Sequence, residues 1–386
     1  MPTIPEPPVT ATATLATSPA HPYFADLYTF DWHGVSVGVA AIGSIAVAIC
    51  LVAGVLLGHP SAGLIAGGGA MTVGFGVNQR IADSRLWPMI AATFAMFLST
   101  LVGMVVGHHG FSILAAAALW SFAYGLLTAR AAGLAWVGQQ AAVTLLVSSA
   151  FPAGPRGAFL RALLILGGGA LQIMITSIFL RMIPELKAHL RELHRAAMQE
   201  TAEFLSRSYA EFRSFRYHPG STLTFPRVPH TAAFAYALRL TITVLLAAEI
   251  YRRLGMQSGY WVPMTALLVQ KPAFAETFTR ALMRIGGTLA GAGLCTFALA
   301  HMQPDPIVLA LLATLCAFLA YVTNSVNYGL FSVFITSNIV FLLSLNSMPG
   351  PVIAHRRALC TIAGGLIALA IHLDALRRHR SLAVAN

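Results

Sequence analysis

The chain has 386 residues, of which 57% are hydrophobic and only 10% are charged, and its mean hydropathy is +0.73. A soluble domain averages about 25% charged residues, so this composition excludes an ordinary soluble protein and indicates a polytopic membrane protein. The net charge of +11 is unevenly placed, since no Lys or Arg precedes Arg80 while eight lie from Arg181 to Arg227. Basic clusters that border apolar spans mark the cytoplasmic side of a membrane, which favours topology over nucleic-acid binding as their origin.

The first segment of the chain, residues 1–34, is rich in Pro, Thr and Ala. It lacks the basic start and apolar core of a signal peptide, so we expect a flexible cytoplasmic leader. The stretch 35–180 is strongly apolar, and a helix needs about 20 apolar residues to cross a bilayer. It therefore predicts a first transmembrane repeat, with helices near 35–57, 61–78, 86–107, 111–129, 133–151 and 157–180.

A polar stretch, 181–229, separates the two apolar parts of the chain. Its leucines recur at helical spacing while Lys, Arg and Glu fill the other faces, which predicts a cytoplasmic amphipathic helix as linker. Apolar sequence resumes over 230–376 and predicts a second transmembrane repeat, with helices near 231–251, 258–271, 281–301, 306–323, 328–346 and 355–375. The Arg-containing tail, 377–386, is expected on the cytoplasmic side.

Two stretches of the chain resemble each other without gaps, one from Gly133 and the other from Gly329. Apolar sequence rarely aligns prolines, arginines and a glycine pair together by chance, so we interpret this as an internal repeat. The matched positions are Pro155 with Pro351, Arg161 with Arg357, and Gly168–Gly169 with Gly364–Gly365. The predicted fold class is an all-α polytopic membrane protein of about twelve transmembrane helices, in two parallel six-helix repeats with cytoplasmic termini. Arg252 and Arg253 would then be periplasmic, against the charge rule.

The second span of each half is expected to be an interrupted helix. SGYWVPMTALLVQKPAF, from Ser258, contains Pro263 and closes with Lys271–Pro272, and the first-half segment from Ser61 is rich in Gly. Proline and glycine break helices, and unwound backbone within a bilayer is tolerated only where it lines a cavity or is buried in protein. These segments therefore indicate a transport site, the alternative being close helix packing through glycine.

Three stretches of the second half carry a resemblance to a known family: YWVPMTALLVQKPAF, TRALMRIGGTLAGA and NYGLFSVFIT. Together they resemble the fusaric acid resistance protein-like family, also called aromatic acid exporters, which is distantly related to plant aluminium-activated malate transporters. The resemblance is sharpest over 230–375. It implies proton-coupled export of aromatic carboxylates, often with a periplasmic adaptor (membrane fusion) protein, and it implies a homodimer. Longer members carry a large cytoplasmic domain after each half, so functions of those domains are not implied for this chain.

Charged residues inside spans are costly and point to function. Arg239 lies near the middle of its predicted span, where its planar guanidinium would suit a carboxylate substrate. Arg284 and Arg161 lie nearer span ends, so snorkelling to headgroups is their alternative role. Tyr260 and Trp261 could stack on an aromatic substrate or belong to the interfacial aromatic belt. The candidate substrate-binding residues are Arg239, Tyr260, Trp261, Gln270, Lys271, Arg284, Arg161 and Arg357.

Glu249 lies well inside a predicted span and is the candidate for proton coupling. The alternative is an intrahelical ion pair, because Arg252 and Arg253 follow three and four residues later. The sequence contains no GxxxxGK[ST], HExxH or CxxC motif, and its four cysteines lie in apolar runs. We therefore expect no catalytic residue, cofactor, metal site or disulfide, and no enzyme.

The sequence as a whole predicts a secondary transporter of the bacterial inner membrane that exports aromatic or other organic carboxylates. Two alternatives stay open, which are a passive organic-anion channel and a non-transporting membrane scaffold. The expected partners are the organic anion, the lipid bilayer, a second copy of the chain and a periplasmic adaptor protein. The sequence does not fix the substrate, the direction of transport or the coupling ion.

Overall fold

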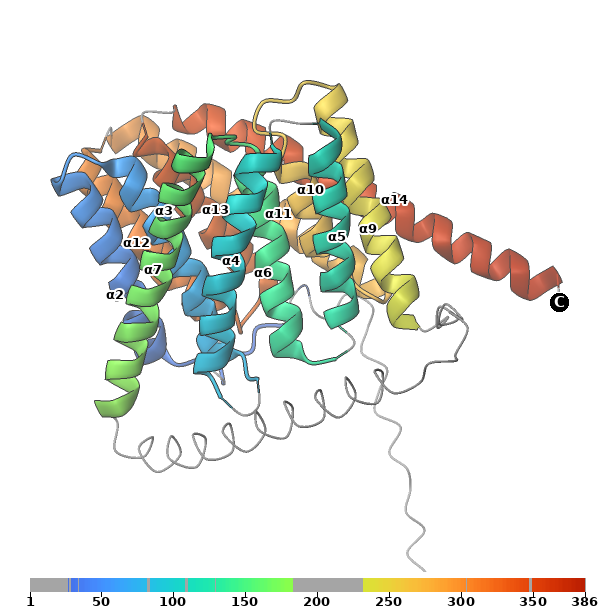
Figure 1. Ribbon diagram of the computed structural model, residues 1–386, viewed down its shortest axis with the longest axis horizontal. Helices are drawn as coiled ribbons and strands as arrows, with labels where there is room; N and C mark the ends of the chain where they lie inside the picture. The colour runs from blue at the N-terminus through green and yellow to red at the C-terminus, as the bar shows by residue number, and fades with distance from the viewer. Residues whose placement is uncertain are drawn as a thin grey trace, which may run out of the picture.

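The computed structural model describes residues 27, 29–33, 35–81, 84–107, 110–128, 130–182, 232–302, 304–346 and 349–385. These residues form helices and short connections, and the described part contains no β-strand apart from an isolated bridge between Ile81 and Ser84. Most of the predicted leader and the predicted amphipathic linker helix lie outside the described residues. The helices stand side by side in one bundle, and α14 crosses behind the others and projects beyond them (Figure 1).

Each half of the described chain contributes helices that follow the predicted apolar stretches. The first half contains α2 (Val37–Leu56), α3 (Pro60–Gly74) with the 3-10 turn η1 (Phe75–Asn78), α4 (Leu86–Val106), α5 (Gly110–Leu127), α6 (Ala132–Ser149) and α7 (Pro155–Met182). The second half contains α9 (Ala232–Arg253), α10 (Trp261–Val269), α11 (Phe274–Met302), α12 (Pro306–Thr323), α13 (Tyr328–Ser344) and α14 (Gly350–Ala385). Gly or Pro occurs in the breaks between α2 and α3, α6 and α7, α11 and α12, and α13 and α14, since these residues are poor helix formers.

Two helix boundaries differ clearly from the prediction. α11 begins at Phe274, seven residues before the predicted start at 281, because its first turns carry polar residues that face a cavity rather than lipid. α14 continues through the predicted tail to Ala385. In both places the helix extends beyond its apolar stretch, so hydropathy alone places the start of α11 too late and the end of α14 too early.

Within the described residues, eight helices are long and apolar enough to cross a membrane: α2, α4, α5, α7, α9, α11, α12 and α14. The other helices of the described part, α3, α6, α10 and α13, are shorter or more polar. α10 is almost wholly buried and packs on α6, α9, α11 and α14. Backbone polar groups of a short helix are tolerated at membrane depth when protein surrounds them. The chain is therefore a multi-pass membrane protein with a partly polar interior.

Helix positions recur at a fixed separation along the chain. α5 and α12 begin and end 196 residues apart, and α6 and α13 begin 196 residues apart, as do Gly133 and Gly329. Helix contacts recur in the same way, since α3 packs on α7 as α10 packs on α14, and α4 packs on α6 as α11 packs on α13. The two halves meet reciprocally, with α5 on α9 and α12 on α2.

Glycines set the closest helix contacts in both halves. A Cβ added at Gly168 of α7 would overlap the carbonyl oxygen of Ala66 on α3. A Cβ added at Gly364 of α14 would overlap the carbonyl oxygen of Val262 on α10. Small residues allow backbones to approach in this way without a side chain between them. Both contacts lie at positions 196 residues apart.

Replacing Gly168 by Ala is expected to destabilise the protein, because the new methyl group forces α3 and α7 apart. Overpacking of a close contact costs about 1–3 kcal/mol. The matched control is Gly167→Ala, since a Cβ there meets nothing within 4 Å. In mild detergent, Gly168→Ala should lower the thermal midpoint while Gly167→Ala leaves it unchanged or slightly raised. Equal shifts for the two variants would contradict the assigned α3–α7 contact.

Candidate functional site

The chain between α9 and α11 is broken twice around the short helix α10. Before α10, Gly255 and Ser258 adopt positive φ angles of 59° each, and Ser258 is the only non-glycine residue of the described part to do so. After α10, Gln270 is extended and Lys271–Pro272 lead into α11. The predicted interruption of this span is therefore present. The first-half segment is instead continuous, because α3 runs directly into η1.

α9 supplies the hydrogen-bond donors that the second break requires. The Arg239 guanidinium donates through Nη2 to the carbonyl oxygens of Lys271 at 3.2 Å and Pro272 at 2.8 Å. The Tyr236 hydroxyl donates to the carbonyl oxygen of Gln270 at 3.1 Å. Carbonyls at a helix end inside a membrane protein need such partners. The contacts assign Arg239 a role in holding the break, and its predicted role as a substrate ligand stays a prediction.

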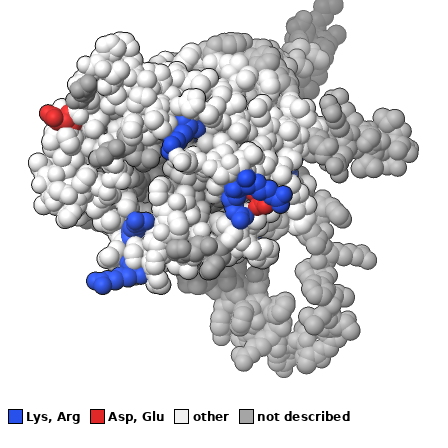
Figure 2. Space-filling view, turned by 90° about the horizontal axis from the view of Figure 1, so that it is seen from above, with Lys and Arg blue, Asp and Glu red and all other residues white. Residues whose placement is uncertain are grey.

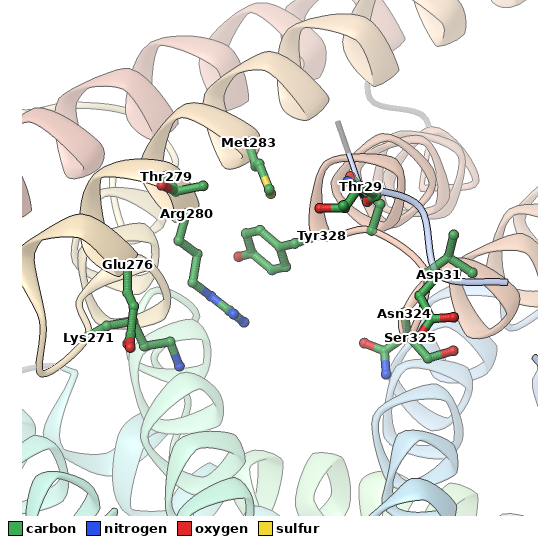
Figure 3. Close-up of a pocket in the computed structure, with 12 residues that line it drawn as sticks. Thr29, Asp31, Lys271, Glu276, Thr279, Arg280, Met283, Asn324, Ser325 and Tyr328 are labelled. Atoms are coloured by element: carbon green, nitrogen blue, oxygen red, sulfur yellow. Dashed lines mark hydrogen bonds between the residues drawn. The ribbon is translucent and has the colours of Figure 1, made fainter. Parts of the chain in front are cut away.

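A cavity of about 380 Å³ lies at the end of the bundle where α11 and α13 begin. Lys271, Glu276 and Arg280 stand on one wall, and Asp31 with the turn between α12 and α13 forms the opposite wall (Figure 3). Arg280 extends into the space, with its guanidinium carbon 3.9 Å from the centre of the Tyr328 ring. The cavity thus presents two cationic side chains to anything that enters. We call it the mouth cavity.

Two further arginines continue inward from the mouth cavity. Arg284 lies one turn beyond Arg280 on α11, is 3% exposed, and interacts with the Tyr328 hydroxyl. Arg357 of α14 is 1% exposed, and the charges of Arg284 and Arg357 are close enough to interact. The ion pairs found among the described residues join Glu249 to Arg252 and to Arg253, and involve none of these three arginines. A charged guanidinium is therefore buried without a carboxylate from the described residues.

Arg357 has a defined orientation. Its guanidinium carbon lies 3.8 Å from the centre of the Trp261 ring, and its Nε donates to the Thr336 hydroxyl at 3.3 Å. Within the described part of the chain, neither Nη1 nor Nη2 has a hydrogen-bond partner. Gln270, which is fully buried, likewise leaves both side-chain polar atoms without partners among the described residues. These donors can serve an anion.

The remaining predicted site residues lie in other surroundings. Tyr260 is buried beside Trp261 and packs edge-on against Phe151, with ring centres 5.8 Å apart. Arg161 is only half-buried and donates to the Phe151 carbonyl oxygen at 3.2 Å. The structure thus brings Tyr260, Trp261 and Arg357 together. It places Arg161 in α7, with its side chain reaching the turn between α6 and α7.

Glu249 forms hydrogen-bonded ion pairs with Arg252 at 2.9 Å and Arg253 at 2.7 Å. This is the geometry of the intrahelical alternative, and the carboxylate is partly exposed rather than enclosed. Seen from above, that face of the bundle is largely uncharged, with a cluster of basic groups around an acidic one (Figure 2). Proton coupling by Glu249 stays a prediction.

Several residues of the site were missed by sequence reasoning. Arg280 and Glu276 fell before the predicted start of their helix, although the spacing of Arg280 and Arg284 by four residues is a helical signal. Asp31 and Tyr328 join the cavity only through the fold. His372 is buried on α14, where its Nδ1 lies 3.1 Å from the Thr277 hydroxyl, which in turn accepts from the Lys271 amide. No local pattern predicts that contact.

No group of three or more His, Cys, Asp or Glu residues in the described part could hold a metal ion. The four cysteines, Cys50, Cys295, Cys316 and Cys360, are free thiols. Apart from the carboxylates of Asp31 and Glu276, the polar groups of the site are guanidinium, ammonium, hydroxyl and amide groups. These are groups that bind anions.

The match to a known family lies in the second half of the chain. Residues 244–371 match the family described as fusaric acid resistance protein-like, which confirms the resemblance over a segment that begins in α9 and ends in α14. The inner membrane protein YccS of Escherichia coli is 31% identical over 143 residues, which are 37% of this chain and 20% of that protein. An uncharacterized protein of Synechocystis is 29% identical over 148 residues, which are 38% of this chain and 20% of that protein.

A third relative, an uncharacterized protein of Neisseria gonorrhoeae, is 27% identical over 140 residues, or 36% of this chain and 33% of that protein. The matched segment therefore spans a third or less of these relatives. No solved structure matches the chain.

Replacing Arg239 by Ala is expected to loosen the break between α10 and α11. The two carbonyls lose their donor, and because both are at least partly exposed each lost hydrogen bond costs about 0.5–1.5 kcal/mol. Arg239 is half-buried, so removing its charge stabilises the protein by less than the lost hydrogen bonds destabilise it. Hydrogen exchange measured by mass spectrometry should accelerate over residues 270–277. The control is Leu238→Ala, on the exposed side of α9, and unchanged exchange in Arg239→Ala would contradict the assigned role.

Proposed function

We propose that this membrane protein transports organic carboxylates across the inner membrane, with aromatic acids as the substrate class and export as the direction. The observation that carries the proposal is the series Arg280, Arg284 and Arg357, which runs from the mouth cavity into the bundle without a carboxylate partner among the described residues. The kinship of residues 244–371 with the fusaric acid resistance protein-like family supports it.

The proposed architecture has twelve transmembrane helices in two parallel six-helix repeats. The recurrence of helix positions at 196 residues and the reciprocal contacts of α5 with α9 and α12 with α2 support this arrangement. Halves related by an axis along the membrane normal pack in this reciprocal way. The short helices α3, α6, α10 and α13 would then form the inner part of each repeat.

The transport path belongs to the second repeat in this proposal. The second half has Arg280, Arg284 and Trp261 along this path. The corresponding residues of the first half, 196 positions earlier, are Ser84, Pro88 and Ile65. An apolar first half cannot stabilise an anion at membrane depth. The first repeat therefore serves as the frame against which α10 is held.

The mouth cavity provides the first binding step. A carboxylate that enters meets the charges of Lys271 and Arg280, which raise its local concentration. Glu276 and Asp31 line the same cavity, and their negative charges keep the anion from being held too tightly there. Transfer to Arg284 follows over one helical turn, about 6 Å. Several weak sites in series allow an ion both to enter and to leave.

The charge distribution supports a cytoplasmic position for the mouth cavity. In the sequence, the strongly basic segment 181–229 joins α7 to α9, and α7 ends and α9 begins at the same end of the bundle (Figure 1). Positive residues near spans stay cytoplasmic. Substrate would then enter from the cytoplasm, in agreement with export. We extend the proposal to a homodimer, a periplasmic adaptor protein as partner, and coupling to the proton gradient, each as the family resemblance implies.

Replacing Arg280 by Gln is expected to reduce the uptake of radiolabelled benzoate into proteoliposomes roughly tenfold or more, because one charge-assisted contact in the mouth cavity is lost. Lys271→Gln should act in the same direction. The control is Arg253→Gln, whose side chain is exposed at the opposite end of α9. Flux is expressed per correctly inserted protein. If Arg280→Gln and Lys271→Gln transport as fast as wild type, the path does not run through the mouth cavity.

Imposing a pH gradient separates the proposal from its alternatives. A proton-coupled exporter accumulates benzoate against its own gradient when protons flow the other way. A passive anion channel follows the anion's electrochemical potential and ignores the pH gradient at a clamped voltage. A membrane scaffold gives no flux above protein-free vesicles. Absence of flux in wild type under both conditions contradicts the transport function.

A further inference from the structure

We infer that Arg357 forms a buried binding site for the carboxylate group of a planar aromatic acid, one site per chain, with Trp261 and Thr336 as its positioning residues. This inference deepens the proposed function, on which it rests. It differs from the mouth cavity, which lies at the end of the bundle and is lined by other residues. The sequence proposes Arg161 and Arg357 equally as substrate-binding residues. The inference assigns that role to Arg357 alone.

The guanidinium of Arg357 is fixed on two of its sides. Trp261 covers one face at 3.8 Å, and the Thr336 hydroxyl holds Nε at 3.3 Å. A planar cation that is stacked and held at one nitrogen has little freedom to rotate. Its outer edge, formed by Nη1 and Nη2, has no hydrogen-bond partner among the described residues. That edge is the part of arginine that binds both oxygens of a carboxylate.

Burial makes this edge a binding site rather than a structural contact. Arg357 is 1% exposed, so its two terminal nitrogens are shielded from water. They have no other hydrogen-bond acceptor within the described chain. The positive charge of Arg284 lies nearby and makes the position still less favourable for a lone cation. An anion would offset both costs together, since it pairs with the guanidinium and neutralises the neighbouring repulsion. The site is therefore built for a negatively charged ligand.

Hydroxyl groups between α11 and α13 add donors at the same depth. Gly287 and Gly291 of α11 lie against Ser332 and Thr336 of α13, so the two helices nearly touch. Thr288 and Ser332 are fully buried, and their hydroxyl oxygens have no partner in the described part of the chain. Such hydroxyls can hydrogen-bond a carboxylate or its water. The α11–α13 seam is thus a polar path and not only a packing contact.

The aromatic residues around the site specify the rest of the ligand. Trp261 and Tyr260 have ring centres 5.6 Å apart, and Tyr260 and Phe151 have ring centres 5.8 Å apart. The rings form a continuous series from Arg357 to Phe151, which is 47% exposed. Aromatic ligands gain offset or edge-on contacts with such rings. A planar aryl carboxylate would leave through this series, and α10, which is broken at both ends, is the element that must move to admit it.

The first half offers a natural comparison. Arg161 occupies the repeat-equivalent position, but it is half-buried and donates to the Phe151 carbonyl oxygen. Ile65 stands at the position equivalent to Trp261, so no aromatic face is available there for stacking. Arg161 therefore has a backbone partner, whereas Arg357 has an unpaired edge. The inferred stoichiometry is one carboxylate per chain rather than two.

The test is equilibrium dialysis of radiolabelled benzoate against the full-length protein in mild detergent, together with flux in proteoliposomes. Wild type should bind one benzoate per chain. Arg357→Gln should weaken binding by roughly tenfold to a hundredfold, as expected for a lost charge-assisted contact. Arg357→Lys, which keeps the charge and loses the fork, should weaken it as well. Arg161→Gln is the matched control and should stay within about twofold of wild type.

Variants that leave Arg357 in place guard against misfolding of Arg357→Gln. Thr336→Val removes the hydrogen-bond partner of Nε, and Trp261→Leu removes the stacked ring. Each variant should weaken benzoate binding. Acetate has no ring, so Trp261→Leu should weaken acetate binding less than benzoate binding. Wild-type affinity in Arg357→Gln, equal losses in Arg161→Gln and Arg357→Gln, a second bound benzoate that is lost in Arg161→Gln, or no benzoate binding by wild type would each overturn the inference.

The binding and flux measurements distinguish a failure of the inferred site from a failure of the proposed transport function. If benzoate binds through Arg357 but wild type shows no flux, the transport function is contradicted and the site stands. If flux is robust while binding and flux ignore Arg357, the site is contradicted and the transport function stands.

Discussion

The rest of the structure depends on how the break between α10 and α11 is satisfied. Within a bilayer every backbone polar group needs a partner, so a helix can stop inside the protein only if neighbours provide donors and acceptors. Arg239 and Tyr236 provide the donors from α9, and Thr277 accepts from the Lys271 amide. These contacts tie α9, α10 and α11 together. They also place Lys271 at the mouth cavity.

The two halves share a packing scheme but differ in polarity. Glycine contacts recur between α3 and α7 and between α10 and α14, so backbone geometry is alike at both places. The second half adds charge to this geometry, with Arg284 and Arg357 nearly inaccessible to solvent. Confining the costly buried charges to one half limits their cost to one set of helices.

Buried arginines serve in two distinct ways in this bundle. Arg239 is used by backbone carbonyls, so its charge supports the break in the helix. Arg357 is held by Trp261 and Thr336, with its outer edge unused by the described residues. The same residue type is thus a structural donor in one place and a candidate ligand site in another. The difference lies in whether a break in a neighbouring helix presents carbonyls.

The sequence by itself determined the helices, the polytopic class, the interrupted second-half span and the kinship of residues 244–371, because hydropathy and helix breakers act locally along the chain. It also identified Arg357 and Trp261 as site candidates. Only the tertiary structure decided which of the arginines lie near each other and why Arg161 and Arg357 have different partners. It alone brought Arg280 and Asp31 into one cavity. Sequence position sets the depth of a residue along its helix. The neighbours it meets depend on how the helices are rotated and packed, which no single stretch of sequence specifies.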